Sequence, residues 1–268
     1  MEFMITVQIG GEDVDADVRD LIAAGSSLGG ARPKASVRDG MGRLCIAKFP
    51  KPSDTDDVSA WEYVALQIAR LACICVPDFR LVRFGGRSIL LLDRFDRSQA
   101  GRVPYISGLT AVQGRDGGSY SYLELVEFIE EHGSSPMYDL HELWKQMLLT
   151  CALGNTDNHL RNYGFLHDGK GWRLSPAFDV NPTQGDFDKS LSTAIDFDVR
   201  DADPRAAFDV REYFRLSAEE ARHIASQTAN VVARWKGLAR KAGIDSRSVK
   251  EMSSCFECGE RRLREIAR

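Results

Sequence analysis

The stretch GNTDNHLRNYGF, Gly154–Phe165, follows an apolar run and gathers acidic, basic and amide side chains within a few residues. It holds Asp157 and Asn162 in the spacing D-x-x-x-x-N. Taken alone, such residues are common at helix ends and in turns. The same spacing also suits phosphoryl transfer, which needs a carboxylate beside the acceptor hydroxyl and an amide oxygen on Mg²⁺. The residues around this stretch distinguish a helix end or turn from a loop for phosphoryl transfer.

A second carboxylate follows the stretch at a useful distance. Asp179 stands seventeen residues after Asn162, in the segment SPAFDVNP. The intervening sequence NYGFL, HDGKG and WRLS predicts a strand, a turn and a strand. Such a hairpin can return the chain so that Asp179 meets the same cation as Asn162, and Mg²⁺ favours carboxylate oxygens. Asp179 could instead simply begin a turn before Asn181 and Pro182.

Upstream, the chain offers the further contacts that a nucleoside triphosphate needs. The Gly29-Gly30 turn would let backbone N–H groups approach phosphates. Lys48 lies on a predicted strand, and Glu62 on the next predicted helix could hold it by a salt bridge. Singly, these residues have ordinary interpretations as a hairpin turn, an exposed charge at a sheet edge and a solvated helix face. Together they follow the order of the protein-kinase template, and one ligand, Mg-ATP, explains them all.

The predicted elements divide the chain near residue 97. Residues 1–97 predict a small sheet, with an amphipathic helix over Val58–Ala72 and a hairpin that turns at Gly85-Gly86. Residues 98–268 predict mostly helices. The expected fold class is α/β (α+β), a two-lobed kinase-like fold with a small β-rich N-lobe and a mostly helical C-lobe.

Three helices of the second part carry their own boundary signals. One is expected to end at Gly133, and one is expected to begin with Asp139 and Glu142 as a capping box. A long helix is expected from Ser217, which forms a capping box with Glu220, to a stop at Gly243.

The amino-acid composition is that of a globular protein. The 268 residues are 43% hydrophobic and 28% charged with a net charge of −4, which is typical of a globular protein and indicates neither a nucleic-acid nor a membrane surface. No run approaches the roughly 18 apolar residues of a membrane span. The N-terminus lacks a signal-peptide pattern, so a cytoplasmic location is expected. Cys255 and Cys258 form a C-x-x-C without the second pair that a zinc site needs.

Several motifs together resemble one known family, the HipA-type serine/threonine kinases of bacterial toxin–antitoxin systems. The resemblance covers residues 25–240. SSLGGARPKA resembles the Gly-rich loop of the family, GNTDNHLRN its catalytic loop, PAFDV its metal-binding segment and LLLDRFDR its strand into the hinge. The D-x-H-x-x-N form is also similar to that of lipid kinases, which share the broader fold.

The resemblance implies a role for each matching residue. Asp157 would be the catalytic base, and Asn162 with Asp179 would hold Mg²⁺. Arg161 could counter charge on the transferred group, and His159 would buttress the loop. The ATP site would comprise Ser27, Gly29, Gly30, Ala31, Lys34, Lys48 and Glu62 around the phosphates, with Asp93, Arg94 and Phe95 bordering the adenine.

The resemblance also implies an activity and its regulation. The chain would be a Mg-ATP-dependent toxin kinase that phosphorylates a protein Ser or Thr, for example in an aminoacyl-tRNA synthetase, and that binds an antitoxin. Ser27, or alternatively Ser26, would be autophosphorylated, and about −2 charges in this loop would repel ATP. A small-molecule or lipid kinase remains an alternative. So does a non-catalytic nucleotide-binding partner in an antitoxin complex.

The resemblance departs from the family pattern at the N-terminus. Family members carry a subdomain that meets the antitoxin before the Gly-rich loop, whereas 25 residues precede Ser26 here. We therefore expect a short form, either partnered by a separate small protein that supplies this subdomain or acting as an orphan kinase. Direct contact with nucleic acid or membrane is not expected.

Overall fold

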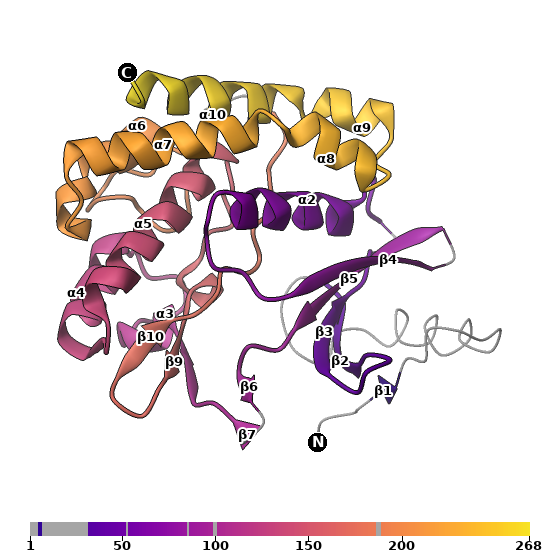
Figure 1. Cartoon of the computed structure of the whole chain (residues 1–268), viewed down its shortest axis with the longest axis horizontal. Coiled ribbons are helices and arrows are strands. Elements are labelled where there is room, and N and C mark those ends of the chain that lie inside the picture. The colour runs from indigo at the N-terminus through magenta and orange to yellow at the C-terminus, as the bar shows by residue number, and fades with distance from the viewer. Residues whose placement is uncertain (1–4, 7–31, 52, 85, 99–100, 186–188) are drawn as a thin grey trace.

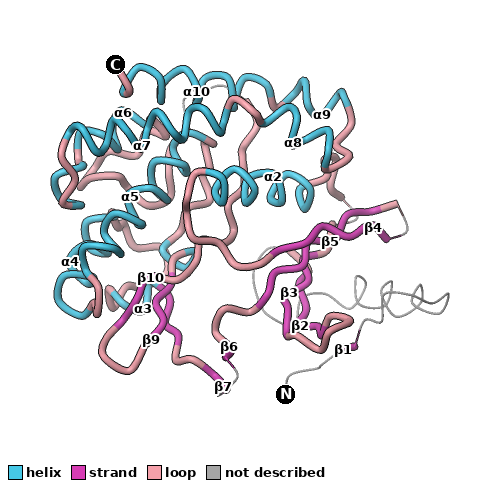
Figure 2. The backbone as a smooth tube through the Cα atoms, viewed as in Figure 1, coloured by secondary structure: helices cyan, strands magenta, loops and turns pink. Residues whose placement is uncertain are grey.

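The computed structural model describes residues 5–6, 32–51, 53–84, 86–98, 101–185 and 189–268 (Figure 1). The predicted phosphate loop with Ser26, Ser27, Gly29, Gly30 and Ala31 lies outside the described residues. The expected mixed α/β architecture is confirmed, with strands gathered in small sheets and helices forming the larger part (Figure 2).

A five-stranded sheet forms the first part of the fold, with strand order β1-β2-β3-β5-β4. All its pairings are antiparallel except that of β1 with β2. The hairpin expected at Gly85-Gly86 joins β4 to β5, where Gly86 has a φ of 76°. The strands span Ile5–Thr6 (β1), Lys34–Arg38 (β2), Leu44–Lys48 (β3), Phe79–Phe84 (β4) and Arg87–Asp93 (β5).

Helix α2, Val58–Leu71, packs against this sheet and is the expected amphipathic helix. Asp57 caps it by accepting from the backbone N–H of Ala60 at 3.0 Å. Its opposite side meets helices from the end of the chain, as Figure 1 shows for α8. There the Trp61 ring lies 6.2 Å from Trp235 and 5.8 Å from Phe256, measured between ring centroids. Helix α2 is therefore held from two sides.

The remaining helices form the larger part of the fold. The helix expected to end at Gly133 does so, and the capping box of Ser217 and Glu220 is present. The helices span Gly108–Ala111 (α3), Tyr122–His132 (α4), Pro136–Ala152 (α5), Pro204–Asp209 (α6), Ala218–Val232 (α7), Trp235–Lys241 (α8), Ser246–Glu251 (α9) and Ser253–Ile266 (α10), with 3₁₀ turns at Leu160–Asn162 (η1) and Arg211–Phe214 (η2). None of the described helices is long and apolar enough to span a membrane.

Short strands complete this part. β8, β9 and β10 form a three-stranded sheet, in which β9 and β10 are the hairpin expected after the D-x-x-x-x-N loop. The strands span Arg97–Ser98 (β6), Gly101–Arg102 (β7), Tyr105–Ser107 (β8), Gly164–His167 (β9) and Trp172–Leu174 (β10).

The capping box expected from Asp139 and Glu142 is wrong. Both residues are buried within α5 and serve tertiary contacts instead. Asp139 accepts from the Arg173 guanidinium at 2.9 Å, and Glu142 accepts from the backbone N–H of Cys75 at 2.6 Å. The two carboxylates therefore join α5 to other segments and do not begin a helix.

The single helix expected from Ser217 to Gly243 is also wrong, because the structure has two helices there, α7 and α8. The first ends at Val232 and the second begins at Trp235. The break lets the Trp235 ring stack on Phe256 with ring centroids 4.6 Å apart. Packing against a distant helix thus overrides the local helical pattern.

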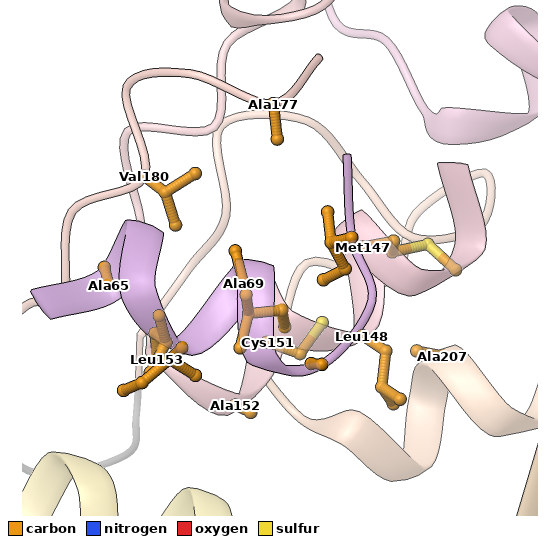
Figure 3. Packing of buried hydrophobic residues seen from close by; sticks show 14 of the residues in the cluster. Ala65, Ala69, Met147, Leu148, Cys151, Ala152, Leu153, Ala177, Val180 and Ala207 are labelled. Atoms are coloured by element: carbon orange, nitrogen blue, oxygen red, sulfur yellow. The ribbon is translucent and has the colours of Figure 1, made fainter. Parts of the chain in front are cut away.

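The main hydrophobic core continues from α2 into the helical part. Figure 3 shows Ala65 and Ala69 of α2 close to Cys151 and Leu153 at the end of α5, and small side chains on α2 permit this approach. A second, smaller cluster lies on the sheet and comprises Ala35, Val37, Cys45, Ala47, Phe49, Ile89 and Leu91. Helix α2 therefore shares its core with the C-terminal helices, while the boundary expected at residues 97/98 stays a prediction.

The aromatic contact between α2 and the C-terminal helices should carry much of the stability. We predict that Trp61→Ala lowers the free energy of unfolding by about 3–5 kcal/mol, because Trp61 is 2% exposed and its removal leaves a cavity beside the stacked rings of Trp235 and Phe256. Urea unfolding measures the change. Leu71→Ala is the matched control on the same helix: Leu71 is 46% exposed and should cost about 0.5 kcal/mol or less. Equal losses in the two variants would contradict the prediction.

Candidate functional site

Lys48 joins three segments of the chain at the end of β3. Its Nζ lies 2.6 Å from Oε1 of Glu62 on α2 and also donates to Oδ1 of Asp179, in the loop after β10. Lys48 is 7% exposed and Glu62 is 3% exposed. The structure thus brings together three of the predicted site residues, although 131 positions separate Lys48 from Asp179.

The charges of this cluster depend on one another. Burial lowers the pKa of Lys48, but the carboxylates of Glu62 and Asp179 outweigh burial and hold that pKa above its usual value. Burial raises the pKa of Asp179, but the ammonium groups of Lys48 and Lys34 bring it below its usual value. The pKa of Glu62 is raised by burial, which Lys48 offsets only in part. Lys48 is therefore a cation and Asp179 an anion at neutral pH.

Asp179 has an unusual backbone conformation. Its φ is 55°, in the left-handed region that Asp tolerates better than most residues. The side-chain nitrogen of Asn155 donates to the Asp179 carbonyl at 3.4 Å. The backbone just before it is fixed by a hydrogen bond from Ala177 N–H to the Cys75 carbonyl at 2.8 Å. These contacts set the direction in which the Asp179 carboxylate leaves the chain.

The D-x-x-x-x-N loop folds back on itself around η1. Nδ2 of Asn162 donates to the Asp157 carbonyl at 2.7 Å, so the amide oxygen is the atom that Asn162 can offer to a cation. The Asp157 side chain is 73% exposed, and its Oδ1 lies 3.2 Å from Nε2 of His159. Asn162 and Asp179 line the same small cavity. The loop therefore presents a carboxylate to solvent and an amide next to the second carboxylate.

Arg161 points to a different neighbour. Its Nη1 forms an ion pair with Asp116, which lies between α3 and α4, and both side chains are more than half exposed. The structure therefore pairs Arg161 with Asp116, and its predicted role in countering charge stays a prediction.

Asn158 anchors the loop, and sequence reasoning does not single it out. It is 1% exposed, its Nδ2 donates to Tyr122 Oη and to the Thr193 carbonyl, and its Oδ1 accepts from Thr193 N–H. The three distances lie between 3.1 and 3.2 Å. The one feature of the sequence that could have pointed to Asn158 is its position directly between Asp157 and His159. A buried amide with all these partners holds the loop in place without facing solvent.

A cavity of about 240 Å³ lies where the sheet meets the helical part. Its lining contains the predicted phosphate-contacting Lys34 and Lys48 as well as Asp179. The rest of the lining is Ile46, Pro77, Leu92, Asp93, Arg94, Phe95, Asp96, Tyr105 and Phe178. The cavity therefore unites cationic groups, an apolar surface and the segment expected to border the adenine.

The side chains of that bordering segment have partners of their own. Asp93 pairs with Arg43 at 3.0 Å and with Arg80 at 3.2 Å, and the Arg94 guanidinium pairs with Asp96 at 2.7 Å. The Phe95 ring lies 5.7 Å from the Phe178 ring, between centroids. These pairings fix the segment as it leaves β5.

The donor set of the site fits a magnesium ion. Asp179 supplies carboxylate oxygens and Asn162 an amide oxygen, and such hard oxygen ligands are the ones that Mg²⁺ takes, usually together with phosphate oxygens. Lys48 contacts Asp179 here and has Glu62 as its second partner.

Comparison with known proteins gives matches over most of the chain. The family model of the HipA-like C-terminal domain matches residues 26–235. A putative kinase of Haemophilus influenzae is 25% identical over 161 residues, which make up 53% of this chain and 47% of that protein. The chain thus spans about half the length of this relative.

Two solved structures share the fold. HipA of Shewanella oneidensis MR-1, from a complex of HipA, HipB and operator DNA, has a TM-score of 0.68 and 17% identity, over 90% of this chain and 67% of that chain. The proinflammatory kinase CtkA of Helicobacter pylori has a TM-score of 0.57 and 18% identity, over 90% of this chain and 94% of its own. At these identities the likeness confirms the expected kinase-like fold.

The ion pair of Lys48 and Glu62 should be strongly coupled. We predict that Glu62→Gln destabilises the protein by about 3 kcal/mol, because it removes a buried counter-charge from Lys48. The double variant Lys48→Met with Glu62→Gln should lose less than the sum of the single losses, by about 1 kcal/mol or more. Urea unfolding of the four proteins of this double-mutant cycle measures the coupling.

The exposed pair Arg70–Asp78 provides the control cycle. Its atoms lie 3.2 Å apart, but the side chains are 47% and 72% exposed, so Arg70→Met and Asp78→Asn should couple by no more than about 0.5 kcal/mol. A Lys48–Glu62 coupling as small as that of the control would show that the buried pair does not act as a unit.

Proposed function

The chain belongs to the family of HipA-like C-terminal domains, and we propose that it is a Mg-ATP-dependent kinase for protein Ser or Thr hydroxyls. The observation that carries the proposal is the position of Lys48, held between Glu62 and Asp179 in the wall of a 240 Å³ cavity. The loop with Asp157 and Asn162 lies next to that wall, since Asn162 and Asp179 line one smaller cavity.

The larger cavity would bind ATP. Its apolar lining from Ile46, Leu92 and Phe178 suits a flat base, and the ammonium groups of Lys34 and Lys48 suit phosphates. Lys48 can exchange Asp179 for a phosphate oxygen while Glu62 keeps it in place, which frees the Asp179 carboxylate. Mg²⁺, held by Asp179 and the amide oxygen of Asn162, would neutralise charge on the phosphates.

Asp157 would act on the acceptor hydroxyl. Its carboxylate reaches solvent, on a loop that Asn158 fixes to the Thr193 segment, so an incoming hydroxyl can meet it. As the hydroxyl oxygen bonds to the γ-phosphorus, the bond from that phosphorus to the ADP oxygen breaks. The hydroxyl proton passes to the Asp157 carboxylate. His159, 3.2 Å away, would orient the carboxylate.

We extend the proposal to a toxin role with a protein target and an antitoxin partner. The family supports it, as does the Shewanella HipA structure, which contains HipB. An aminoacyl-tRNA synthetase is the target that the family resemblance suggests, and a separate small protein would supply the N-terminal subdomain. The match to nearly the whole of CtkA supports a kinase built from this core.

Removal of the base should abolish transfer without unfolding the protein. We predict that Asp157→Asn lowers the rate of phosphoryl transfer to protein by about 10²–10⁴-fold, because the acceptor hydroxyl loses its proton acceptor. Transfer from γ-labelled ATP to cell proteins, separated by gel electrophoresis, measures the rate. Asp209→Asn, a change of an exposed Asp on α6, is the control and should leave the rate unchanged.

Three outcomes of this assay would change the proposal. Label on lipids or metabolites, with none on protein, would indicate a small-molecule or lipid kinase. A wild-type protein that binds ATP but transfers no phosphate would indicate a non-catalytic partner, and unchanged transfer in Asp157→Asn would remove Asp157 from its proposed role.

Autophosphorylation gives a second test. After phosphatase treatment and incubation with Mg-ATP, we expect intact mass spectrometry to show one added phosphate, on Ser27 or Ser26. The mass change should be lost in Asp157→Ala and Asp179→Ala, and also when both serines are replaced by Ala. A phosphorylated loop should then bind ATP more weakly, because about −2 charges repel its phosphates. No added phosphate on the wild-type chain would contradict the expectation.

A further inference from the structure

Asp179 depends on a neighbour for its conformation. Its left-handed backbone is uncommon for a residue with a side chain, so surrounding contacts must hold it. The carbonyl of Asp179 accepts from Nδ2 of Asn155 at 3.4 Å. Asn155 is 4% exposed and is itself held by a hydrogen bond from its N–H to the Thr150 carbonyl at 3.0 Å. The Asn155 backbone is therefore fixed, and its side-chain amide meets the backbone of Asp179.

The other end of the Asn155 amide is buried without a partner. Its Oδ1 has no hydrogen-bond partner among the residues that the structure describes. Gln146 on α5 is 6% exposed, and its Nε2 likewise has none within the described part of the chain. One of these atoms is an acceptor and the other is a donor. Buried polar atoms of this kind are normally satisfied, if not by protein then by ordered water.

Asn155 and Gln146 line the same cavity. Its volume is about 20 Å³, and its lining also includes Asn162 and Asp179. Apolar side chains form part of its wall: Figure 3 labels Ala69 of α2 and also Ala177 and Val180, which lie on either side of Asp179 in the chain. One water molecule needs about 10–15 Å³ and two or more polar partners, so this cavity suits one water and excludes larger ligands.

We propose that this cavity binds one ordered water, which accepts from Gln146 Nε2 and donates to Asn155 Oδ1, and that Asn155 is thereby a positioning residue for Asp179. The water would fix the orientation of the Asn155 amide, whose nitrogen then stays on the Asp179 carbonyl. Helix α5 is thus linked to the metal-binding segment through three consecutive hydrogen bonds. The expected effect of Asn155 on Mg²⁺ binding rests on the proposed function, whereas the bound water and the backbone conformation of Asp179 do not.

The test separates positioning from general stability by measuring ATP binding with and without MgCl₂. Isothermal titration calorimetry should show that Asn155→Ala weakens ATP binding about tenfold in the presence of Mg²⁺, since partners that orient a metal ligand typically contribute 10–100-fold to metal affinity. Without Mg²⁺ the affinity should stay within about twofold of wild type, because Asp179 then has no metal to hold. Equal weakening in both conditions would overturn the positioning role.

Substitutions at Gln146 test the water. Gln146→Met fills the same space without a donor and should reproduce the Mg²⁺-specific weakening. Gln146→Glu can donate when its carboxyl is protonated, so it should weaken Mg²⁺-dependent binding less than Gln146→Met does. Gln227→Met is the matched control, because Gln227 is exposed on α7, where its side chain bonds His223 at 2.9 Å, and this change should leave ATP binding unaltered.

Crystal structures test for the water directly, and this test does not depend on catalysis. The wild-type structure should show one water within hydrogen-bond distance of Asn155 Oδ1 and Gln146 Nε2, and Gln146→Met should lack it. An empty cavity in the wild type would overturn the proposal. If the wild-type chain binds ATP but transfers no phosphate, the proposed function fails while the water and its effect on ATP binding remain measurable.

Discussion

A single buried ammonium group makes the arrangement of this site possible. Two carboxylates, Glu62 and Asp179, come close together in a region from which water is largely excluded, and they would repel each other without a cation between them. Lys48 supplies that cation from the sheet. Because its two partners come from α2 and from the loop after β10, one interaction relates the sheet to both of the other segments. The position of each segment therefore depends on the other two.

The supports around this cluster are of two kinds. Helix α2 is fixed by aromatic packing, in which Trp61 lies against Trp235 and Phe256 and donates to Ser248 Oγ at 3.0 Å. The loop with the exposed Asp157 is fixed by hydrogen bonds of the buried Asn158. Both kinds place a side chain of the candidate site on a rigid base, as the proposed catalysis would require.

Sequence patterns pointed to more of the candidate-site residues than of the residues that hold them in place. A proposed catalytic base or cation ligand is restricted to a few residue types, so Asp157, Asn162 and Asp179 could be picked out by type and spacing. The hairpin after the loop, helix α2, the end of α4 and the start of α7 followed from local periodicity and caps. The break after Val232 and the tertiary role of Glu142 depend on distant partners, which no local pattern contains. The supporting amides Asn155 and Asn158 differ from exposed ones only in their burial, which the sequence does not state.

The aromatic contact of Trp61 can form only late in the synthesis of the chain. Its partners Trp235 and Phe256 and its hydrogen-bond acceptor Ser248 lie far toward the C-terminus, and 187 positions separate Trp61 from Ser248. Translation delivers the N-terminal residues first. While the chain is still on the ribosome, α2 therefore lacks the neighbours that hold Glu62 against Lys48. The site gains its full support only when α8, α9 and α10 have emerged. A nascent chain without these helices therefore lacks a fully supported site.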